Sequence, residues 1–400
     1  MSILRIAVVG VGAEEGSRAR GYLATIRKLG HLYDLCALCD AGESALTAVG
    51  ENFGVTALYT DVEKMLTNEK PDILFVLVPT DGQTVVALSA IRHWCHLITE
   101  IPYALTLGMG DAIHRAAEEK GLKWEIAENV WLWPKVRLKQ EIVQQGLLGD
   151  LNHARLSYPA GSYHGLNAIR KILNLAPLRA QGYAQATEVR PYRNYGGGEE
   201  TRRWWESGIV EFENDVSCIY EMPTSPGAKR GFHWDIEGKD GYLSNDDLVL
   251  YSNGKEESYT IQEEYEEIGG KRVLSAVSVA TDPIVRWENP YKPYGVSGKD
   301  DVAKAAILES LHTAVTQDAE PVYGVAGGRV DYEMWVALRE SAGRQGQWID
   351  IPLTEPTDLE NRIHSEWVRY YGGDPVEDAE RLLGARYGRL SAMWTVAGWL

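Results

Sequence analysis

Short apolar runs alternate with amphipathic segments over the first 125 residues. Runs typical of buried strands occur at Ile3–Val9, Leu35–Cys39, Ile73–Val78 and Leu97–Thr99. Between them, apolar residues recur at helical spacing over Ser17–Leu29, Glu43–Asn52, Asp61–Thr67, Gln83–Trp94 and Gly108–Lys120. Strands that alternate with helices in this way predict an α/β domain with a parallel, doubly wound sheet. We assign residues 1–125 to it.

The pattern changes after Lys123. Strands are predicted at Asn152–Tyr158, Ile209–Glu213, Val216–Tyr220, Tyr242–Leu243, Asp247–Tyr251, Glu257–Ile261 and Trp348–Ile351, and helices at Lys135–Gln145, Asp301–Thr316 and Val330–Ser341. Most of these strands follow one another across polar turns such as Asn214-Asp215, which favours antiparallel pairing. Residues 126–355 are therefore predicted to form an α+β domain with an open, mostly antiparallel sheet, and residues 356–400 a helical C-terminal extension.

In two segments of the second domain, the hydrophobic positions show no clear helical or strand periodicity. The run Glu263–Glu267 contains four glutamates and is expected to be a solvated loop or edge. Residues 281–299 contain Pro283, Pro290 and Pro293 among aromatic residues and glycines, and are expected to form an irregular loop.

Composition narrows the class of protein. Four hundred residues favour two domains, and the net charge of −17 argues against a nucleic-acid surface. No apolar run approaches a membrane span and no leader pattern opens the chain, so we expect a cytoplasmic protein. Four cysteines make no disulfide framework. Cys36 and Cys39 lie three apart in a predicted strand and so face opposite sides, and the run His93–His96 has no second ligand pair nearby. No metal site is predicted.

The run Gly10-Val-Gly12-Ala-Glu-Glu-Gly16 follows the first predicted strand and opens the first predicted helix. Glycines let such a turn close and let backbone N–H groups approach a pyrophosphate at the positive end of the helix. The spacing is one residue longer than the usual fingerprint, but the strand–turn–helix context is the required one. Gly10, Gly12 and Gly16 are therefore predicted to bind a dinucleotide in a Rossmann domain.

Asp40 ends the second predicted strand, 24 residues after Gly16. An acidic residue at this position accepts hydrogen bonds from the ribose hydroxyls of NAD. The five residues that follow, Ala41 to Ala45, include no Arg or Lys that would hold a 2′-phosphate. The expected cofactor is therefore NAD.

Together with Asp40, the segments Val78-Pro79-Thr80 and Thr99-Glu100-Ile101-Pro102 resemble the glucose–fructose oxidoreductase/inositol dehydrogenase/MocA (Gfo/Idh/MocA) family. The resemblance runs from Leu4 to about Leu353, and no single motif in it is decisive. It implies a Rossmann domain followed by a substrate domain that also forms oligomers. It further implies cofactor contacts at Pro79, Thr80, Glu100, Pro102 and Asn129, with Glu100 and Pro102 beside the nicotinamide.

The chain departs from this family at the groups that carry its chemistry. The family's usual Glu-Lys-Pro motif places a lysine at the substrate hydroxyl, where this chain has Ile101. Its second signature, roughly Asp-x-Gly-x-His-x-x-Asp, is similar to Ala160–Asn167, which keeps His164 but replaces both acids. The resemblance implies that His164 is the catalytic base, a role that suits imidazole near neutral pH. Tyr163 adjoins it as a second catalytic candidate.

Substrate contacts are predicted at Trp131, Arg190 and Arg193. Trp131 stands where the family has an arginine and can stack on a sugar face. Arg190 and Arg193 precede the glycine-rich run that ends at Gly198, and two tryptophans follow it. Arginines beside aromatic residues suit a carbohydrate that carries a carboxylate, phosphate or sulfonate, although a solvent-exposed basic loop would show the same composition.

Three functions remain open from the sequence. The first is an NAD-dependent oxidoreductase that acts on a hydroxyl of a sugar, sugar acid or cyclitol without the family's lysine. The second, which the resemblance permits, is an NAD-dependent glycoside hydrolase that uses transient oxidation and elimination with no net redox change. The third is a non-catalytic regulator that senses a nucleotide or sugar. A homo-oligomer paired through the C-terminal sheet is expected in each case.

Overall fold

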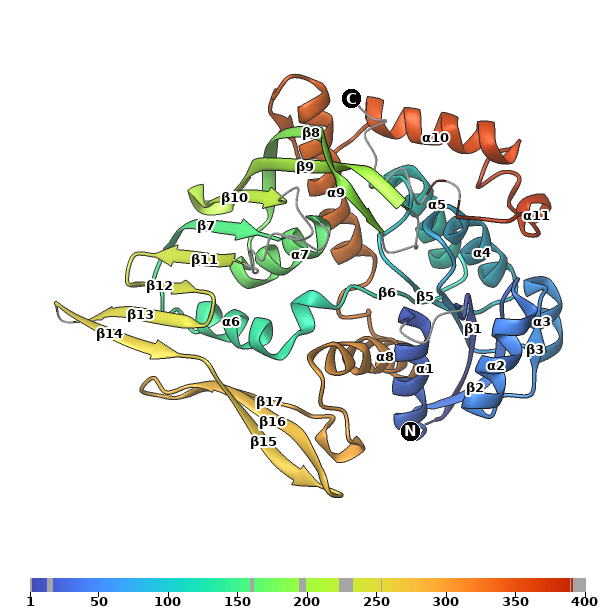
Figure 1. Cartoon of the computed structure of the whole chain (residues 1–400), viewed down its shortest axis with the longest axis horizontal. Helices are drawn as coiled ribbons and strands as arrows, with labels where there is room; N and C mark the ends of the chain where they lie inside the picture. The colour runs from blue at the N-terminus through green and yellow to red at the C-terminus, as the bar shows by residue number, and fades with distance from the viewer. Residues whose placement is uncertain are drawn as a thin grey trace. The chain divides into compact units, whose positions relative to one another are not determined.

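The computed structural model describes residues 2–12, 17–158, 162–193, 199–222, 233–252, 254–388 and 390. The chain forms two compact units, each built from several segments (Figure 1). The first contains residues 1–129, 291–329 and 360–391, and the second contains residues 130–290, 330–359 and 392–400. The boundaries expected from the sequence, 1–125, 126–355 and 356–400, follow chain order, whereas the units interleave segments.

Six parallel strands form the sheet of the first unit, in the order β3-β2-β1-β4-β5-β6. They are β1 (Leu4–Val9), β2 (Tyr33–Cys39), β3 (Leu58–Tyr59), β4 (Ile73–Val76), β5 (His96–Thr99) and β6 (Trp124–Ile126). The strand order reverses between β1 and β4, and ligands of doubly wound sheets bind at such a point. The predicted fold of this half is confirmed, with two short strands, β3 and β6, that the sequence pattern had not revealed.

The helices predicted at 17–29, 43–52, 61–67, 83–94, 108–120 and 301–316 are all present, with ends shifted by a few residues, and, among the described residues, two further helices lie in the predicted C-terminal extension. They are α1 (Arg18–Lys28), α2 (Glu43–Phe53), α3 (Val62–Glu69), α4 (Thr80–Arg92), α5 (Leu107–Glu118), α8 (Lys299–Gln317) and α11 (Ala379–Leu382), with most of α10 (Asp358–Tyr371). Side chains cap three of them: Ser17, Asp61 and Thr106 each accept a hydrogen bond from the backbone three residues later. Among the described helices, none is both long and apolar enough to cross a membrane.

The carboxylate of Glu125, in β6, binds the segment 291–329 to the Rossmann sheet. It is almost fully buried and accepts hydrogen bonds from Gly324 N at 2.8 Å and from the hydroxyl of Ser310, which lies in α8. Burial raises the pKa of Glu125, while these hydrogen bonds oppose the shift. Because leaving such donors unpaired would cost about 1–3 kcal/mol each, β6 and α8 are held together as one body.

The second unit is dominated by a nine-stranded sheet in the order β14-β13-β12-β11-β7-β10-β9-β8-β18, beside a three-stranded sheet β15-β16-β17. The first sheet comprises β7 (Leu151–Ser157), β8 (Pro177–Arg193), β9 (Glu199–Phe212), β10 (Ser217–Met222), β11 (His233–Gly238), β12 (Gly241–Ser244), β13 (Asp247–Ser252), β14 (Lys255–Thr260) and β18 (Ile349–Asp350). The second comprises β15 (Gln262–Ile268), β16 (Lys271–Val279) and β17 (Val285–Glu288). Among the described strands of these two sheets, only β7 and β10 pair in parallel, which confirms the predicted mostly antiparallel sheet.

Three helices accompany these sheets: α6 (Pro134–Gln144), α7 (Ser162–Leu173) and α9 (Gly324–Gly343), the last of which begins in the first unit. The sequence pattern predicted α6 and most of α9 but not α7 or β8. It also treated 281–299 as one irregular loop, although β17 lies within that range. The glutamate-rich run is the edge strand β15, in which Glu263, Glu266 and Glu267 are exposed and Glu264 is half-buried.

Lys139, in α6, carries a buried ammonium group. The residue is 4% exposed, its Nζ makes no hydrogen bond, and the carboxylate of Asp246 lies 3.8 Å away. Burial lowers the pKa of Lys139 to about 8, against the opposing effect of Asp246. Asp246 is bonded more closely to Lys135, at 2.7 Å.

We expect Lys139→Met to stabilise the protein at pH 7 by up to about 3 kcal/mol, because the charge is then no longer buried. The unfolded chain keeps its proton up to the ordinary lysine pKa of 10.5, whereas the folded protein releases it near pH 8. The stability of the unsubstituted protein should therefore rise between these values. Urea unfolding at pH 7, 8.5 and 10 should show the advantage of the variant shrinking as pH rises.

The matched control is Lys135→Met, which removes a half-exposed partner of the same carboxylate and should lower stability slightly without this pH trend. A Lys139→Met variant that is less stable at pH 7 would show that the buried ammonium contributes favourably.

Candidate cofactor-binding site

The turn after β1 is shaped by glycine backbone. Gly10 has φ +89°, and a Cβ at this position would lie 2.7 Å from the carbonyl carbon and oxygen of Leu77. Gly12 also has a positive φ, +68°. Side chains are strained in this conformation, and at Gly10 no space exists for one. The predicted roles of Gly10 and Gly12 in shaping the turn thus have a steric cause, whereas Gly16 lies outside the described residues.

Asp40 closes this turn from the end of β2. Its Oδ2 accepts hydrogen bonds from Val11 N at 2.8 Å and from Gly12 N at 3.2 Å, and its Oδ1 accepts one from Gly42 N at 2.8 Å. One carboxylate therefore fixes both the glycine turn and the loop after β2. Oδ2 thus uses both of its lone pairs, whereas Oδ1 can accept one further hydrogen bond, so a ribose hydroxyl can still bind here.

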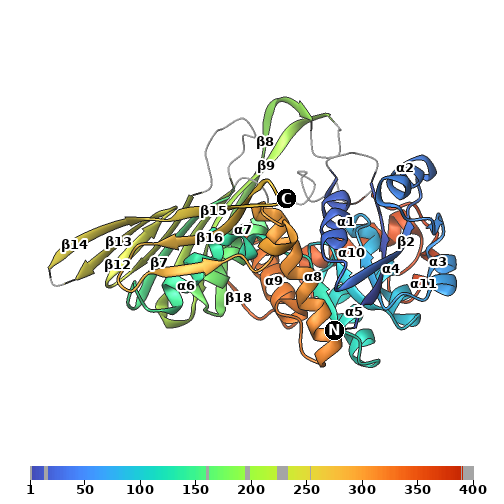
Figure 2. The same ribbon diagram turned by 90° about the horizontal axis from the view of Figure 1, so that it is seen from below.

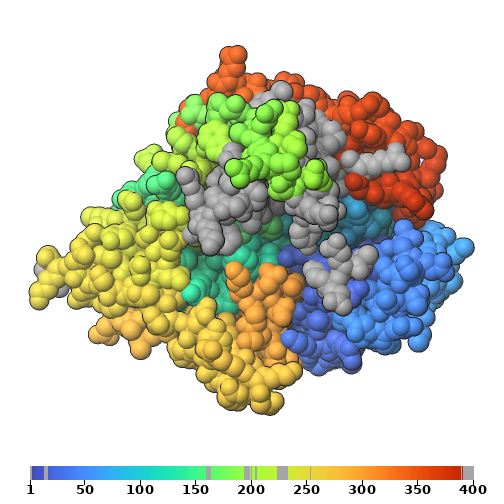
Figure 3. All heavy atoms as spheres, viewed as in Figure 1, coloured from blue at the N-terminus to red at the C-terminus, as the bar shows by residue number. Residues whose placement is uncertain are grey.

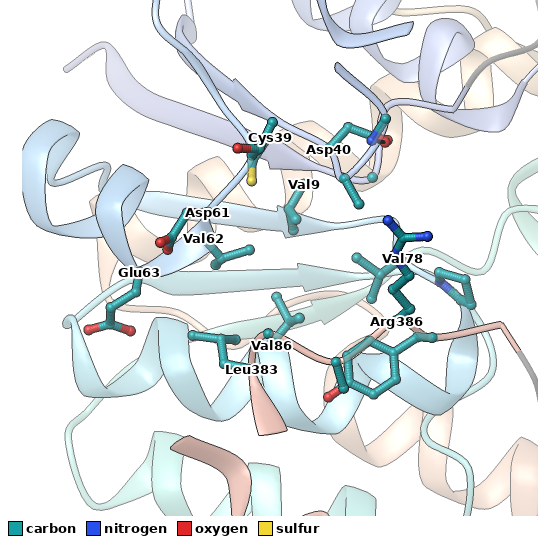
Figure 4. A pocket seen from close by; sticks show the side chains of 18 of the residues that line it. Val9, Cys39, Asp40, Asp61, Val62, Glu63, Val78, Val86, Leu383 and Arg386 are labelled. Atoms are coloured by element: carbon teal, nitrogen blue, oxygen red, sulfur yellow. Dashed lines mark hydrogen bonds between the residues drawn. The ribbon is translucent and has the colours of Figure 1, made fainter. Parts of the chain in front are cut away.

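A pocket of about 1070 Å³ opens beside Asp40 at the carboxyl edge of the sheet (Figure 4). Its polar side includes Gly10, Asp40, Thr60 and Asp61, and Pro79 also lines it. Apolar side chains form other parts of the wall; they are Val9, Val62, Val78, Val86 and Leu383. An apolar pocket with a few placed polar groups suits a flat base joined to a ribose. The adenosine half of a dinucleotide has this shape and polarity.

Cys39 also lines the pocket, but it is unsuited to covalent chemistry. Burial, together with the nearby carboxylates of Asp40 and Asp61, raises the pKa of the Cys39 thiol to about 12. The thiol is therefore protonated at neutral pH. Within the described ranges, no group of three or more His, Cys, Asp or Glu side chains is arranged to hold a metal.

Two of the predicted cofactor contacts, Glu100 and Asn129, are linked through Arg18, near the start of α1, and Asp300. Glu100 forms an ion pair with Arg18, and Asp300 lies 3.6 Å from the same guanidinium. Asn129 donates a hydrogen bond to Asp300. Burial lowers the pKa of Arg18, but the Glu100 carboxylate more than offsets this, so the pKa is raised overall. Glu100 thus holds a permanent cation, a partner that sequence reasoning had missed.

The other cofactor candidates lie on neighbouring backbone. Pro79 is the residue that precedes α4, and Thr80 is the first residue of that helix. Pro102 is buried two residues after Glu100. The cofactor-binding roles of these residues, like those of Glu100 and Asn129, stay predictions.

His164 belongs to the second unit, in the first turn of α7. It is partly exposed, and its ring centre lies 6.3 Å from that of the buried Tyr158. Three residues on, Asn167 is fully buried and donates to Asp331 at 2.6 Å, and Arg170 pairs with the same carboxylate. The asparagine that replaces the family's second acid therefore ties α7 to α9. The side chain of Tyr163 lies outside the described residues.

Trp131 and Arg190 differ in their surroundings. Trp131 is 4% exposed, and the ammonium of Lys171 lies 4.5 Å from its ring centre. Arg190 lies near the exposed end of β8, where the pairing with β9 is interrupted between Glu188 and Tyr192. The side chain of Arg193 lies outside the described residues. The substrate-binding roles of all three stay predictions.

Residues 4–127 match the family model described as the oxidoreductase family with an NAD-binding Rossmann fold, Gfo/Idh/MocA. The predicted resemblance is thereby confirmed, and the first unit contains an NAD-binding domain of this oxidoreductase family. The predicted NAD-binding Rossmann fold is confirmed with it for these residues.

Individual relatives cover less of the chain. D-apiose dehydrogenase from Paraburkholderia graminis is 28% identical over 31% of this chain and 33% of its own length. Alpha-N-acetylgalactosaminidase from Shewanella oneidensis is 25% identical over 40% of this chain and 35% of its own length. The match thus spans about a third of the length of these curated relatives.

A solved structure extends the likeness in fold to most of the chain. Levoglucosan dehydrogenase in complex with NADH and levoglucosan superposes with a TM-score of 0.67 at 15% identity. The superposition covers 88% of this chain and all of that one. At this identity the likeness establishes the two-part fold, and about an eighth of the present chain has no counterpart in it.

We expect Asp40→Ala to weaken NADH binding about tenfold to a hundredfold, because hydrogen bonds to a charged group contribute roughly 1.5–3 kcal/mol. The substitution removes the ribose acceptor and the acceptor that holds Val11 N and Gly12 N. Isothermal titration with NADH measures the effect, and Asp34→Ala, at an exposed position of the same strand, is the matched control. Equal affinity of both variants would dismiss the ribose role of Asp40.

Proposed function

We propose that this protein is an NAD-dependent oxidoreductase acting on a hydroxyl group of a sugar, sugar acid or cyclitol. The observation that carries the proposal is the pocket at the carboxyl edge of the six-stranded sheet, where Asp40 is bonded to the glycine turn. The family match over residues 4–127 supports a nicotinamide cofactor. The D-apiose dehydrogenase relative and the levoglucosan dehydrogenase neighbour favour a carbohydrate substrate.

In this proposal, one group of residues binds the cofactor and another accepts the proton of the substrate. The backbone at Gly10 and Gly12 leaves room for phosphate groups, and Asp40 binds a ribose hydroxyl. When bound, NAD supplies the hydride acceptor. His164 accepts the proton of the substrate hydroxyl, a step that typically contributes about 10²–10⁴ in rate.

Ile101 contributes no charge where the family places its lysine. A cation that stabilises the negative charge developing on the substrate oxygen typically lowers the barrier by about 3–4 kcal/mol. Without the lysine, either another group stabilises this charge or the hydroxyl proton is transferred before the hydride. We propose that an anionic substrate, held by Arg190 and Arg193, is oriented toward His164 instead. Neutral sugars should then be poorer substrates than sugar acids or sugar phosphates of the same stereochemistry.

A second candidate is redox-neutral glycoside hydrolysis. The match to alpha-N-acetylgalactosaminidase, which reaches further along the chain than that to D-apiose dehydrogenase, favours it. The two functions differ in a simple assay. A dehydrogenase accumulates NADH in proportion to the product, whereas a glycosidase of this kind releases its aglycone from nitrophenyl glycosides with catalytic NAD and no lasting absorbance at 340 nm.

We expect His164→Ala to lower turnover about 10²–10⁴-fold and to leave the Kd of NADH unchanged, because the imidazole serves the substrate and not the cofactor. Steady-state kinetics across a panel of neutral and anionic sugars, with NADH titration in parallel, measure both quantities. His153→Ala, on β7 in the same unit, is the control. Loss of NADH affinity in His164→Ala would show that the histidine has been misplaced, and full activity would remove it as the base.

We also propose a homo-oligomer that pairs through the open face of the nine-stranded sheet. Tyr183 in β8 and Ile219 in β10 project from this sheet and are 56% and 43% exposed. Their neighbours along each strand, Ala184 and Tyr220, are buried on the opposite face. Exposed apolar groups gathered on one sheet face are typical of a contact surface.

Ile219→Glu should convert this oligomer into monomers, because a carboxylate cannot be buried without a partner. Light scattering coupled to size-exclusion chromatography measures the mass, with Ile284→Glu, an exposed position outside this sheet, as the control. A monomeric unsubstituted protein, or an Ile219→Glu variant of unchanged mass, would refute the proposed contact.

A further inference from the structure

The C-terminal segment of residues 383–387 lies in the wall of the dinucleotide pocket. Leu383, Gly384, Ala385, Arg386 and Tyr387 all line it, facing residues from β1, β2 and α4 that lie some 300 positions earlier in the sequence. Helix α11 contacts α4, and the two lie side by side in Figures 1 and 2. On the surface, atoms of the C-terminal part of the chain (red) border atoms of its N-terminal part (blue) in Figure 3. The pocket is therefore completed by the end of the chain.

A buried carboxylate fixes this segment in place. Asp81, in the first turn of α4, is 1% exposed and accepts hydrogen bonds from Gly388 N at 2.9 Å and from Leu390 N at 3.0 Å. It also accepts one from the hydroxyl of Tyr371 at 2.5 Å. Since a buried carboxylate without donors would be costly, the segment and α4 stabilise each other.

Close packing adds to these hydrogen bonds. A Cβ at Gly82 would lie 2.5 Å from the ring of Tyr387, so the ring rests directly on the backbone of α4. The Tyr387 hydroxyl donates to the carbonyl of Leu382 at 2.6 Å, which joins the ring to α11. Arg92 and Glu380, both at the pocket, pair across α4 and α11 at 3.3 Å.

Arg386 carries the charge of this wall. Its side chain extends from the segment across the pocket toward Val78 and Asp40 (Figure 4). Among the described residues, no carboxylate lies within 4.0 Å of its guanidinium, in contrast to Arg92 and Arg381. An unpaired guanidinium beside an apolar pocket matches a flat, electron-rich base and its ribose phosphate.

We propose that Arg386 binds the adenosine half of NAD and that residues 383–387, anchored through Asp81, form the outer wall of this subsite. This inference rests on the proposed use of NAD and adds a group of binding residues from the C-terminal extension. The wall shields the adenosine from solvent, so its main effect is to lower the dissociation rate of the cofactor. The sequence motifs of the Rossmann domain do not predict this wall.

The test compares the binding of NADH and ADP-ribose to the full-length protein and its variants by isothermal titration. Arg386→Ala should weaken both ligands about tenfold, since a cation over an aromatic base contributes an amount of this order. Arg369→Ala, an exposed arginine of the same extension that does not line the pocket, is the matched control. Its affinities should equal those of the unsubstituted protein.

Asp81→Asn tests the anchor separately. It keeps the shape of the side chain but replaces one acceptor oxygen by a donor, so Gly388 N, Leu390 N and the Tyr371 hydroxyl can no longer all be bonded. We expect faster hydrogen exchange at residues 383–388 and a dissociation rate of NADH raised about tenfold in stopped-flow displacement.

The outcomes separate the two proposals. If the unsubstituted protein binds neither NADH nor ADP-ribose, the proposed function fails. If it binds both, and Asp40→Ala weakens them while Arg386→Ala does not, the inference about Arg386 alone is overturned. If Arg386→Ala weakened the binding of NADPH but not that of NADH, the inference would also be overturned. Arg386 would then recognise a 2′-phosphate and not the adenosine that both cofactors share.

Discussion

The backbone of Gly10 approaches the chain that leaves β4 so closely that no side chain fits between them. This contact fixes the spacing at the point where the order of the parallel strands reverses, and the pocket opens there. Asp40 reaches the same turn from β2 and holds its N–H groups. The site is thus set by backbone proximity first and by side-chain chemistry second.

Buried carboxylates join distant segments of the chain into the first unit. Glu125 bonds to Ser310 and Gly324, Asp81 bonds to the segment that ends at Leu390, and Glu360 accepts a hydrogen bond from Leu107 N at 2.7 Å. Each carboxylate is almost fully buried and each bonds across more than 180 residues. Because a buried acid needs its donors, these three carboxylates specify which late segments belong to the Rossmann sheet.

Local patterns were sufficient to predict the parts of the fold that depend on neighbours in sequence. The alternating strands and helices, the glycine turn and Asp40 could all be identified because period, steric need and spacing are properties of short segments. Strand β8 could not, because its buried face consists of Ala180, Gly182 and Ala184, which carry little hydrophobic signal. Gly182 has no room for a side chain beneath α9, since a Cβ would lie 2.0 Å from the carbonyl oxygen of Leu338.

The candidate site shows the same division. Glu100 was identified through a resemblance, but its ion pair with Arg18 depends on how α1 and β5 pack. No sequence motif identifies Arg386, because this residue reaches the pocket only when the C-terminal segment packs against α4. Sequence reasoning therefore identified the residues nearest the strand ends and missed those that long-range packing adds.

The acidic edge strand β15 has a consequence for the protein in concentrated solution. A bare strand edge offers unpaired backbone groups on which another chain can add, the first step of edge-to-edge aggregation. Here the exposed carboxylates of Glu263, Glu266 and Glu267 follow that edge, while the half-buried Glu264 pairs with Arg286. A second copy that approached in register would bring like charges together, so the three-stranded sheet is protected against unwanted growth at this edge.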